Sequence, residues 1–167
     1  MALRYLSLSK SLVLAVVATL AVTLASAPIA RADDRLQFTG TTVSGAPFDG
    51  ASLHGKPVVM FFWASWCPFS NAGAPAVSQI AAANPKVTFV GVAGRSDVGA
   101  MEAFVSKYHL NFTNLNDADG SLWARFNVPW QPAYLFIRPD GSSTFVNNPT
   151  QAMSEQDLSD RLATLAT

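Results

Sequence analysis

The chain has 167 residues, of which half are hydrophobic and 13% are charged, with equal numbers of basic and acidic residues. This length and composition are typical of one globular domain. No run of basic residues is present, which argues against nucleic acid as a partner.

The first 32 residues have the three parts of a secretory signal peptide. Arg4 and Lys10 precede an apolar stretch at residues 12–27, and Ala30-Arg31-Ala32 forms an A-x-A cleavage site. We expect cleavage after Ala32, leaving a single domain over residues 33–167 that is secreted or extracytoplasmic, without stable membrane insertion. An uncleaved signal that anchors the chain is the alternative, although the apolar stretch is short for a spanning helix.

Apolar runs and helical periodicity alternate along the rest of the chain. The apolar runs predict strands at residues 58–63, 87–92, 112–115, 133–137 and 144–146. Helical spacing and capping residues predict helices at residues 67–83, from Asp97 to Tyr108, near residues 120–126, and after Ser154. The order, β-α-β-α followed by a hairpin and a helix, predicts an α/β domain with a mixed central β-sheet flanked by helices on both faces.

The only cysteine, Cys67, lies in the run Trp66-Cys67-Pro68-Phe69-Ser70. This run has the layout of a C-x-x-C redox site with serine in the second position. In an exported protein a single cysteine is a free thiol, a mixed disulfide or an intermolecular bridge. At the start of a helix, unpaired N–H groups and the helix dipole favour the thiolate, and the Ser70 hydroxyl can donate a hydrogen bond to it. We expect a reactive, partly exposed thiol rather than a small buried hydrophobe.

The chain resembles thioredoxin-fold extracytoplasmic thiol–disulfide oxidoreductases of the TlpA/ResA/DsbE type. The matching residues are the strand 58–63, the run 64–70, Ala74-Pro75, and residues 104–108, 116–120, 127–133 and 139–141. The resemblance implies a thioredoxin-like fold in which Cys67 and Ser70 are the catalytic pair. It maps the family's cis-proline onto Pro132, facing the redox corner.

The same resemblance implies a substrate-binding groove around the cysteine. Its predicted residues are Trp66, Pro68, Phe69, Trp130, Gln131 and Pro132. An ordinary trans proline at a strand start is the alternative for Pro132, and packing in the core or within a loop is the alternative for Trp130.

Three positions depart from the family pattern. Ser70 replaces the resolving cysteine, Gly73 stands where relatives often carry a glutamate, and Phe61 lies where thioredoxin has a buried aspartate. The first two departures suggest that the dithiol cycle has been given up.

Two functions follow, from different classes. The first is a secreted monothiol oxidoreductase that forms mixed disulfides with exported client proteins and depends on an external low-molecular-weight thiol or a redox partner protein for release. The second is a non-catalytic module that binds extended polypeptides. A one-cysteine peroxidase is a weaker third hypothesis, because Ala64 replaces the expected threonine.

We predict no cofactor and no metal, since His54 and His109 lie apart without neighbouring ligands.

Overall fold

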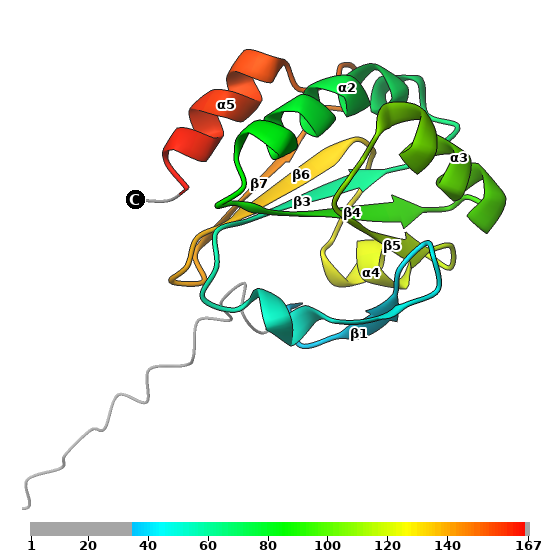
Figure 1. The fold of residues 1–167 in the computed structure, drawn as a ribbon, viewed down its shortest axis with the longest axis horizontal. Coiled ribbons are helices and arrows are strands. Elements are labelled where there is room, and N and C mark those ends of the chain that lie inside the picture. Colours follow the sequence, from blue (N-terminus) through cyan, green and yellow to red (C-terminus); the bar gives the residue numbers. More distant parts are fainter. Residues whose placement is uncertain (1–34, 166–167) are drawn as a thin grey trace, which may run out of the picture.

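The centre of the protein is a five-stranded mixed sheet in the order β5-β4-β3-β6-β7 (Figure 1). Its strands are β3 (Val58–Trp63), β4 (Thr88–Gly94), β5 (Thr113–Asp117), β6 (Ala133–Ile137) and β7 (Ser143–Asn147). The structure is a computed structural model that describes residues 35–165. The predicted signal peptide, its cleavage site, and the first two and last two residues of the predicted domain lie outside this range.

Strand β3 is the middle strand, as its continuous apolar run predicts, and all six of its residues are buried. It pairs in parallel with β4 and antiparallel with β6. In the antiparallel pair Phe62 lies opposite Ala133, so the carboxyl end of β3 meets the start of β6. This register brings the segment after β3 close to the segment before β6.

Helices cover both faces of the sheet, which confirms the predicted architecture. They are α2 (Pro68–Ala83), α3 (Val98–Tyr108), α4 (Ser121–Arg125) and α5 (Glu155–Ala163). Figure 1 shows α2, α3 and α5 over one face and α4 on the other. Alternate β3 side chains enter the two cores, Phe61 on the α2 side and Phe62 on the α4 side. Within residues 35–165 no helix is long and apolar enough to cross a bilayer.

The residues expected to begin two helices do so. The Asp97 carboxylate accepts a hydrogen bond from the Ala100 amide at 2.9 Å, and the Ser154 hydroxyl accepts one from the Asp157 amide at 3.1 Å. Both side chains satisfy backbone N–H groups that have no partner within the helix.

The N-terminal part of the described chain contains structure that the sequence did not predict. A two-stranded hairpin, β1 (Thr39–Thr41) with β2 (Pro47–Asp49), leads into the 3-10 helix η1 (Gly50–Leu53). The strands have three residues each, which is too short for a visible period-2 pattern. Leu36 and Leu53 from this segment complete the core on the α4 side.

Helix α4 depends on one buried carboxylate. Asp117, 1% exposed, accepts hydrogen bonds from the Leu122 and Trp123 amides at 2.8 and 2.9 Å and from the Ser121 hydroxyl at 3.3 Å. Burial raises the pKa of Asp117, and the two amide hydrogen bonds oppose that shift. The carboxylate thus does the capping that Gly120, at the N-cap position, cannot do with a side chain.

We predict that Asp117→Asn lowers the free energy of unfolding by about 1–3 kcal/mol, because one of the two amides then faces an NH₂ group instead of an acceptor. Urea denaturation measures the change. Asp119→Asn is the matched control, since Asp119 is exposed and its remaining oxygen can still accept from the Ser121 amide. Equal stability of the two variants would contradict this account.

Candidate active site

Cys67 lies at the corner between β3 and α2. It is the N-cap residue of α2, with extended backbone angles (φ −80°, ψ 120°), and Pro68 occupies the first turn. Its amide donates to the Ala64 carbonyl at 3.1 Å, which closes the turn after β3. Proline suits this position because the first helical N–H groups have no partner within the helix. The predicted strand–helix corner is therefore present.

The Cys67 thiol faces the loop that precedes β6. Its Sγ atom lies 3.7 Å from the Gln131 carbonyl oxygen, to which the thiol donates, and the Gln131–Pro132 peptide bond is cis. Cys67 is only 4% exposed. The expectation of a partly exposed thiol is wrong for this conformation, because the 130–132 loop packs against the sulfur.

Ser70 does not contact the sulfur by a hydrogen bond. It is fully buried, and its hydroxyl accepts from the Ala64 amide at 3.3 Å. A helical side chain leans toward the helix N-terminus, and from position 70 that direction leads to the end of β3. In this structure Ser70 therefore stabilises the β3–α2 corner and does not donate to Cys67, in contrast to the sequence-based expectation.

Three large apolar side chains near the corner are exposed. Trp66 is 58% exposed, Phe69 37% and Trp130 60%, so core packing does not account for Trp130. The Trp66 indole donates to the Arg95 carbonyl at 2.9 Å, which holds that ring while leaving it accessible. Pro68 is also exposed, Gln131 is half-buried and Pro132 is buried. A buried thiol is thus surrounded by accessible apolar groups on two different loops.

Two side chains that the sequence analysis missed support the corner. The Asn71 amide group donates to the Ser65 and Cys67 carbonyls, both at 2.9 Å, and Asn71 accepts from the Tyr108 hydroxyl at 2.7 Å. Asn71 lies one helical turn after Cys67, and this spacing is the only signal in the sequence. Tyr108 comes from α3, so helix packing is needed to find it.

The loop before β6 has a support of its own. Asn147, at the end of β7, donates to the Trp130 carbonyl at 2.9 Å and to the Pro132 carbonyl at 3.2 Å. The sequence analysis did not single out Asn147, because only the pairing of β6 with β7 brings it to this loop.

The two positions where the resemblance implied an acid, 61 and 73, are filled by close packing. The Phe61 ring stacks on the Tyr134 ring with centroids 5.2 Å apart. A Cβ atom on Gly73 would lie 3.1 Å from the Ala152 Cβ and 3.2 Å from the Tyr134 Oη, tighter than an ordinary contact. Glycine is therefore the residue that this helix contact accommodates best.

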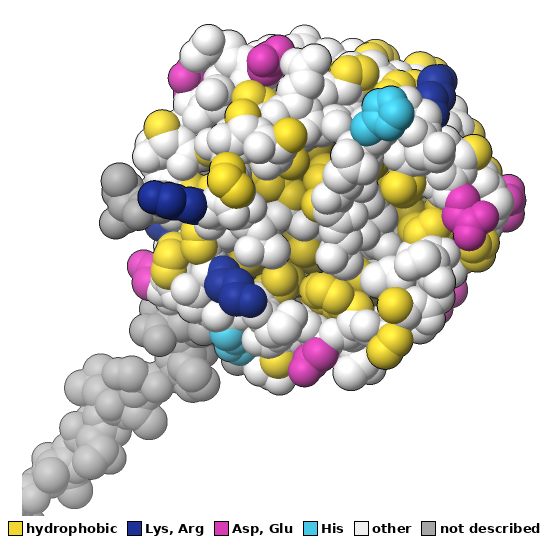
Figure 2. Space-filling model, viewed as in Figure 1, with side chains coloured by type: hydrophobic (Ala, Val, Ile, Leu, Met, Phe, Trp, Pro, Cys, Tyr) yellow, Lys and Arg dark blue, Asp and Glu magenta, His cyan; other side chains and the backbone are white. Residues whose placement is uncertain are grey.

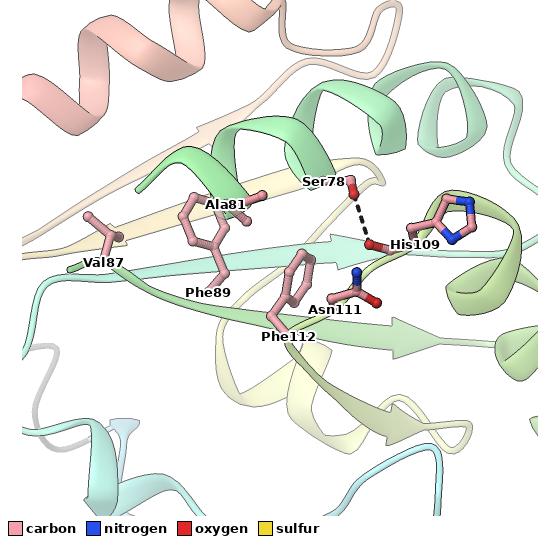
Figure 3. Close-up of a pocket in the computed structure, with 8 residues that line it drawn as sticks. Ser78, Ala81, Val87, Phe89, His109, Asn111 and Phe112 are labelled. Carbon is pink, nitrogen blue, oxygen red and sulfur yellow. Dashed lines mark hydrogen bonds between the residues drawn. The ribbon is translucent and has the colours of Figure 1, made fainter. Parts of the chain in front are cut away.

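The other surface features do not bring reactive side chains together as the Cys67 corner does. Figure 3 shows a cavity between the end of α2 and the start of β4, with Phe89 and Phe112 among its lining residues. His109 takes part through its backbone carbonyl, which accepts from the Ser78 hydroxyl at 2.8 Å. On the face drawn in Figure 2 the charged side chains are scattered. Within residues 35–165 no three His, Cys, Asp or Glu side chains are grouped to hold a metal.

A thioredoxin-like fold with a cysteine at the start of the helix after the central strand defines the class of thioredoxin-like disulfide oxidoreductases. The chain belongs to the AhpC/TSA family, whose model matches residues 32–146.

Similar proteins agree with this class. The chain is 73% identical over 134 residues to the soluble secreted antigen MPT53 of Mycobacterium tuberculosis, which covers 80% of this chain and 78% of that protein. It is similar to the crystal structure of a secreted Mycobacterium tuberculosis disulfide oxidoreductase homologous to Escherichia coli DsbE, with 73% identity, a TM-score of 0.78, and coverage of 80% and 99% of the two chains. The structure of the Mycobacterium tuberculosis protein dsbF is 49% identical, with a TM-score of 0.75 and coverage of 79% and 97%.

We predict that Asn71→Asp destabilises the protein by about 1–3 kcal/mol, because a carboxylate would face the two carbonyls that the amide now satisfies. The added negative charge near the sulfur also disfavours the thiolate, so alkylation of Cys67 by iodoacetamide at neutral pH should slow. Urea denaturation and alkylation rates measure the two effects. Asn111→Asp, at an exposed position after the end of α3, is the control. A variant at position 71 that matched it in both readouts would show that Asn71 has no such role.

Proposed function

We propose that this protein is an exported monothiol–disulfide exchange enzyme in which Cys67 is the nucleophile. The observation that carries the proposal is the position of Cys67, at the N-cap of α2 and 3.7 Å from the Gln131 carbonyl. Helix N-termini favour thiolate over thiol, and thiolate is the species that attacks a disulfide. Because Cys67 is the only cysteine of the chain, its catalytic cycle would be limited to thiol–disulfide exchange.

The reaction balances with one external thiol. The Cys67 thiolate attacks one sulfur of a substrate disulfide, forming a mixed disulfide and releasing the other substrate sulfur as a thiolate. A low-molecular-weight thiol, or the thiol of a redox partner protein, then attacks the mixed disulfide and regenerates the Cys67 thiolate. Each step makes one disulfide and breaks one, so the enzyme would rearrange or transfer disulfides without net oxidation.

The exposed groups beside the thiol suit an extended polypeptide. Trp66, Pro68, Phe69 and Trp130 would contact client side chains, because accessible aromatic rings contribute apolar area with few rotatable bonds. The backbone of Gln131, ahead of Pro132, would pair with the client main chain once the Cys67 thiol no longer donates to its carbonyl. Ser70 would act as a positioning residue for the corner through Ala64.

The second candidate is a polypeptide-binding module without catalytic exchange. The 4% exposure of Cys67 favours it, because a covered sulfur is poorly placed for attack unless the 130–132 loop moves. A one-cysteine peroxidase has less support, since Ala64 occupies the position three residues before the cysteine where such a peroxidase is expected to have threonine.

We predict that the wild type accelerates the recovery of activity by scrambled ribonuclease in the presence of a small thiol, and that Cys67→Ala does not. With Ellman's reagent, the wild type should release about one equivalent of thionitrobenzoate per chain and retain the second as an adduct, whereas Ser70→Cys should release about two and end as an internal disulfide. Absorbance and intact mass measure these outcomes.

Ser78→Cys is the matched control. A second thiol at this position, farther along α2, would keep its own adduct and would not displace the adduct on Cys67. If the wild type and Cys67→Ala recover ribonuclease at the same rate, exchange is excluded and the binding module remains. Ser70→Cys chains that keep two adducts would show that more than the second sulfur has been lost.

We also propose that residues 1–32 are removed on export and that residues 33–167 are the working domain. N-terminal sequencing of the protein recovered from culture medium should then begin at Asp33. Recovery only from membranes, with an intact N-terminus, would support the uncleaved anchor instead.

A further inference from the structure

A cavity of about 180 Å³ lies beside the redox corner, among strands β6 and β7, the loop that follows them and helix α5. Its lining includes Pro132, the residue after the carbonyl that accepts from the Cys67 thiol, and Tyr134, two residues farther along β6. Pro132 thus connects the cavity to the redox corner, although Cys67 does not line it.

Two buried polar atoms in this lining have no hydrogen-bond partner within residues 35–165. They are the Tyr134 hydroxyl oxygen and the Arg161 Nε atom, and Tyr134 is only 2% exposed. The Tyr134 hydroxyl lies beside Ala152, another lining residue, since the position of a Gly73 Cβ would be within 3.2 Å of both. Buried polar atoms are nearly always paired, so each one without a partner needs an explanation.

Both atoms are hydrogen-bond donors at neutral pH. Arginine remains protonated in proteins. Burial raises the pKa of Tyr134, and the Met153 backbone beside the phenol oxygen opposes the shift. The phenol has no acceptor for its proton within residues 35–165. The phenol is therefore protonated, and the group that would complete this pair of donors is an acceptor.

Arg161 supplies the positive charge in the lining of the cavity. Its guanidinium lies 5.7 Å from the centre of the Phe136 ring, and its Nε atom has no hydrogen-bond partner within the described part of the chain. Asp157 also lines the cavity, but its carboxylate is exposed and accepts from the Ser154 hydroxyl at 2.9 Å. The Arg161 Nε atom therefore has no hydrogen bond to this carboxylate, although both charged groups share the cavity lining.

We propose that this cavity is a substrate subsite that binds a carboxylate carried by the disulfide substrate, with Tyr134 and Arg161 as its donors. A carboxylate accepts several hydrogen bonds, and its bonds to a guanidinium are charge-assisted. The carboxylate belongs either to an acidic side chain of a client polypeptide or to a small thiol. The inference rests on the proposed function of Cys67 and adds a preference among its substrates.

The kinetic test compares two disulfides that differ only in charge, 3-(2-pyridyldithio)propionic acid and its amide. Attack by the Cys67 thiolate forms the mixed disulfide and releases 2-thiopyridone, which is followed by absorbance. The acid-to-amide rate ratio of the wild type should be about tenfold higher than that of Arg161→Met, a difference equivalent to one lost charge-assisted contact. Tyr134→Phe should lower the ratio too, while Lys86→Met, which removes an exposed charge elsewhere, should not.

Tyr134→Phe keeps the ring that stacks on Phe61, so its thermal unfolding should match the wild type and show that the fold is intact. Equal acid-to-amide ratios in the wild type and Arg161→Met would overturn the subsite. Slow reaction with both reagents, no faster than free cysteine, would instead count against the proposed function.

A binding test distinguishes failure of the subsite from failure of the proposed function, because it does not need the Cys67 thiol. Propionate, but not propionamide, should shift the backbone amide resonances of Ala152 and Met153 in Cys67→Ser, and Arg161→Met should abolish the shift. Absence of these shifts would overturn the subsite whatever the kinetics.

The source of the carboxylate is tested with a second pair of pyridyl disulfides, made from the N-acetylated dipeptide amides Glu-Cys and Gln-Cys. A preference for the Glu peptide supports a client side chain, and a preference limited to the propionic acid reagent supports a small thiol. No preference in either pair overturns the proposal.

Discussion

The antiparallel pairing of β3 with β6 is the constraint on which the site depends. Cys67 follows β3 and Pro132 precedes β6, and antiparallel strands place the end of one beside the beginning of the other. The pairing of Phe62 with Ala133 leaves only a few residues on each side to reach the corner. A shift of this register by one residue would move alternate β3 side chains into the wrong core as well as separate the sulfur from the loop.

Both sides of this corner are held by side-chain amides rather than by apolar packing alone. Asn71 fixes the carbonyls of the turn that contains Cys67, and Asn147 fixes the carbonyls of the loop that contains Trp130 and Pro132. Each asparagine comes from a regular element, α2 or β7, so rigid parts of the fold position two short loops. The Trp130 ring remains exposed because hydrogen bonds to the loop backbone, and not to the ring, hold this loop in place.

Buried polar groups in this protein divide into two kinds. Asp117 accepts hydrogen bonds from the start of α4, and these partly offset the cost of burying a carboxylate. Tyr134 and Arg161 are left without partners in a cavity beside the redox corner. The first arrangement stabilises a helix, whereas the second is the basis of the subsite proposed above.

The local sequence determined the elements that carry the chemistry. The apolar run at Val58–Trp63, the Cys67-Pro68 helix start and the capping residues Asp97 and Ser154 depend on neighbours within a few positions, and the structure has each of them. The mixed sheet with helices on both faces followed from their order. The short β1–β2 hairpin did not, because three-residue strands have no readable periodicity.

Only the tertiary structure decided the surroundings of the sulfur. The burial of Cys67 under the 130–132 loop, the bond from Ala64 to Ser70, and the support from Tyr108 and Asn147 all join residues from different elements. The same holds for the pair of Tyr134 and Arg161, which strand pairing and the packing of α5 bring to one cavity. Contacts of this kind depend on the register between strands and on helix packing, which the order of residues along the chain does not display.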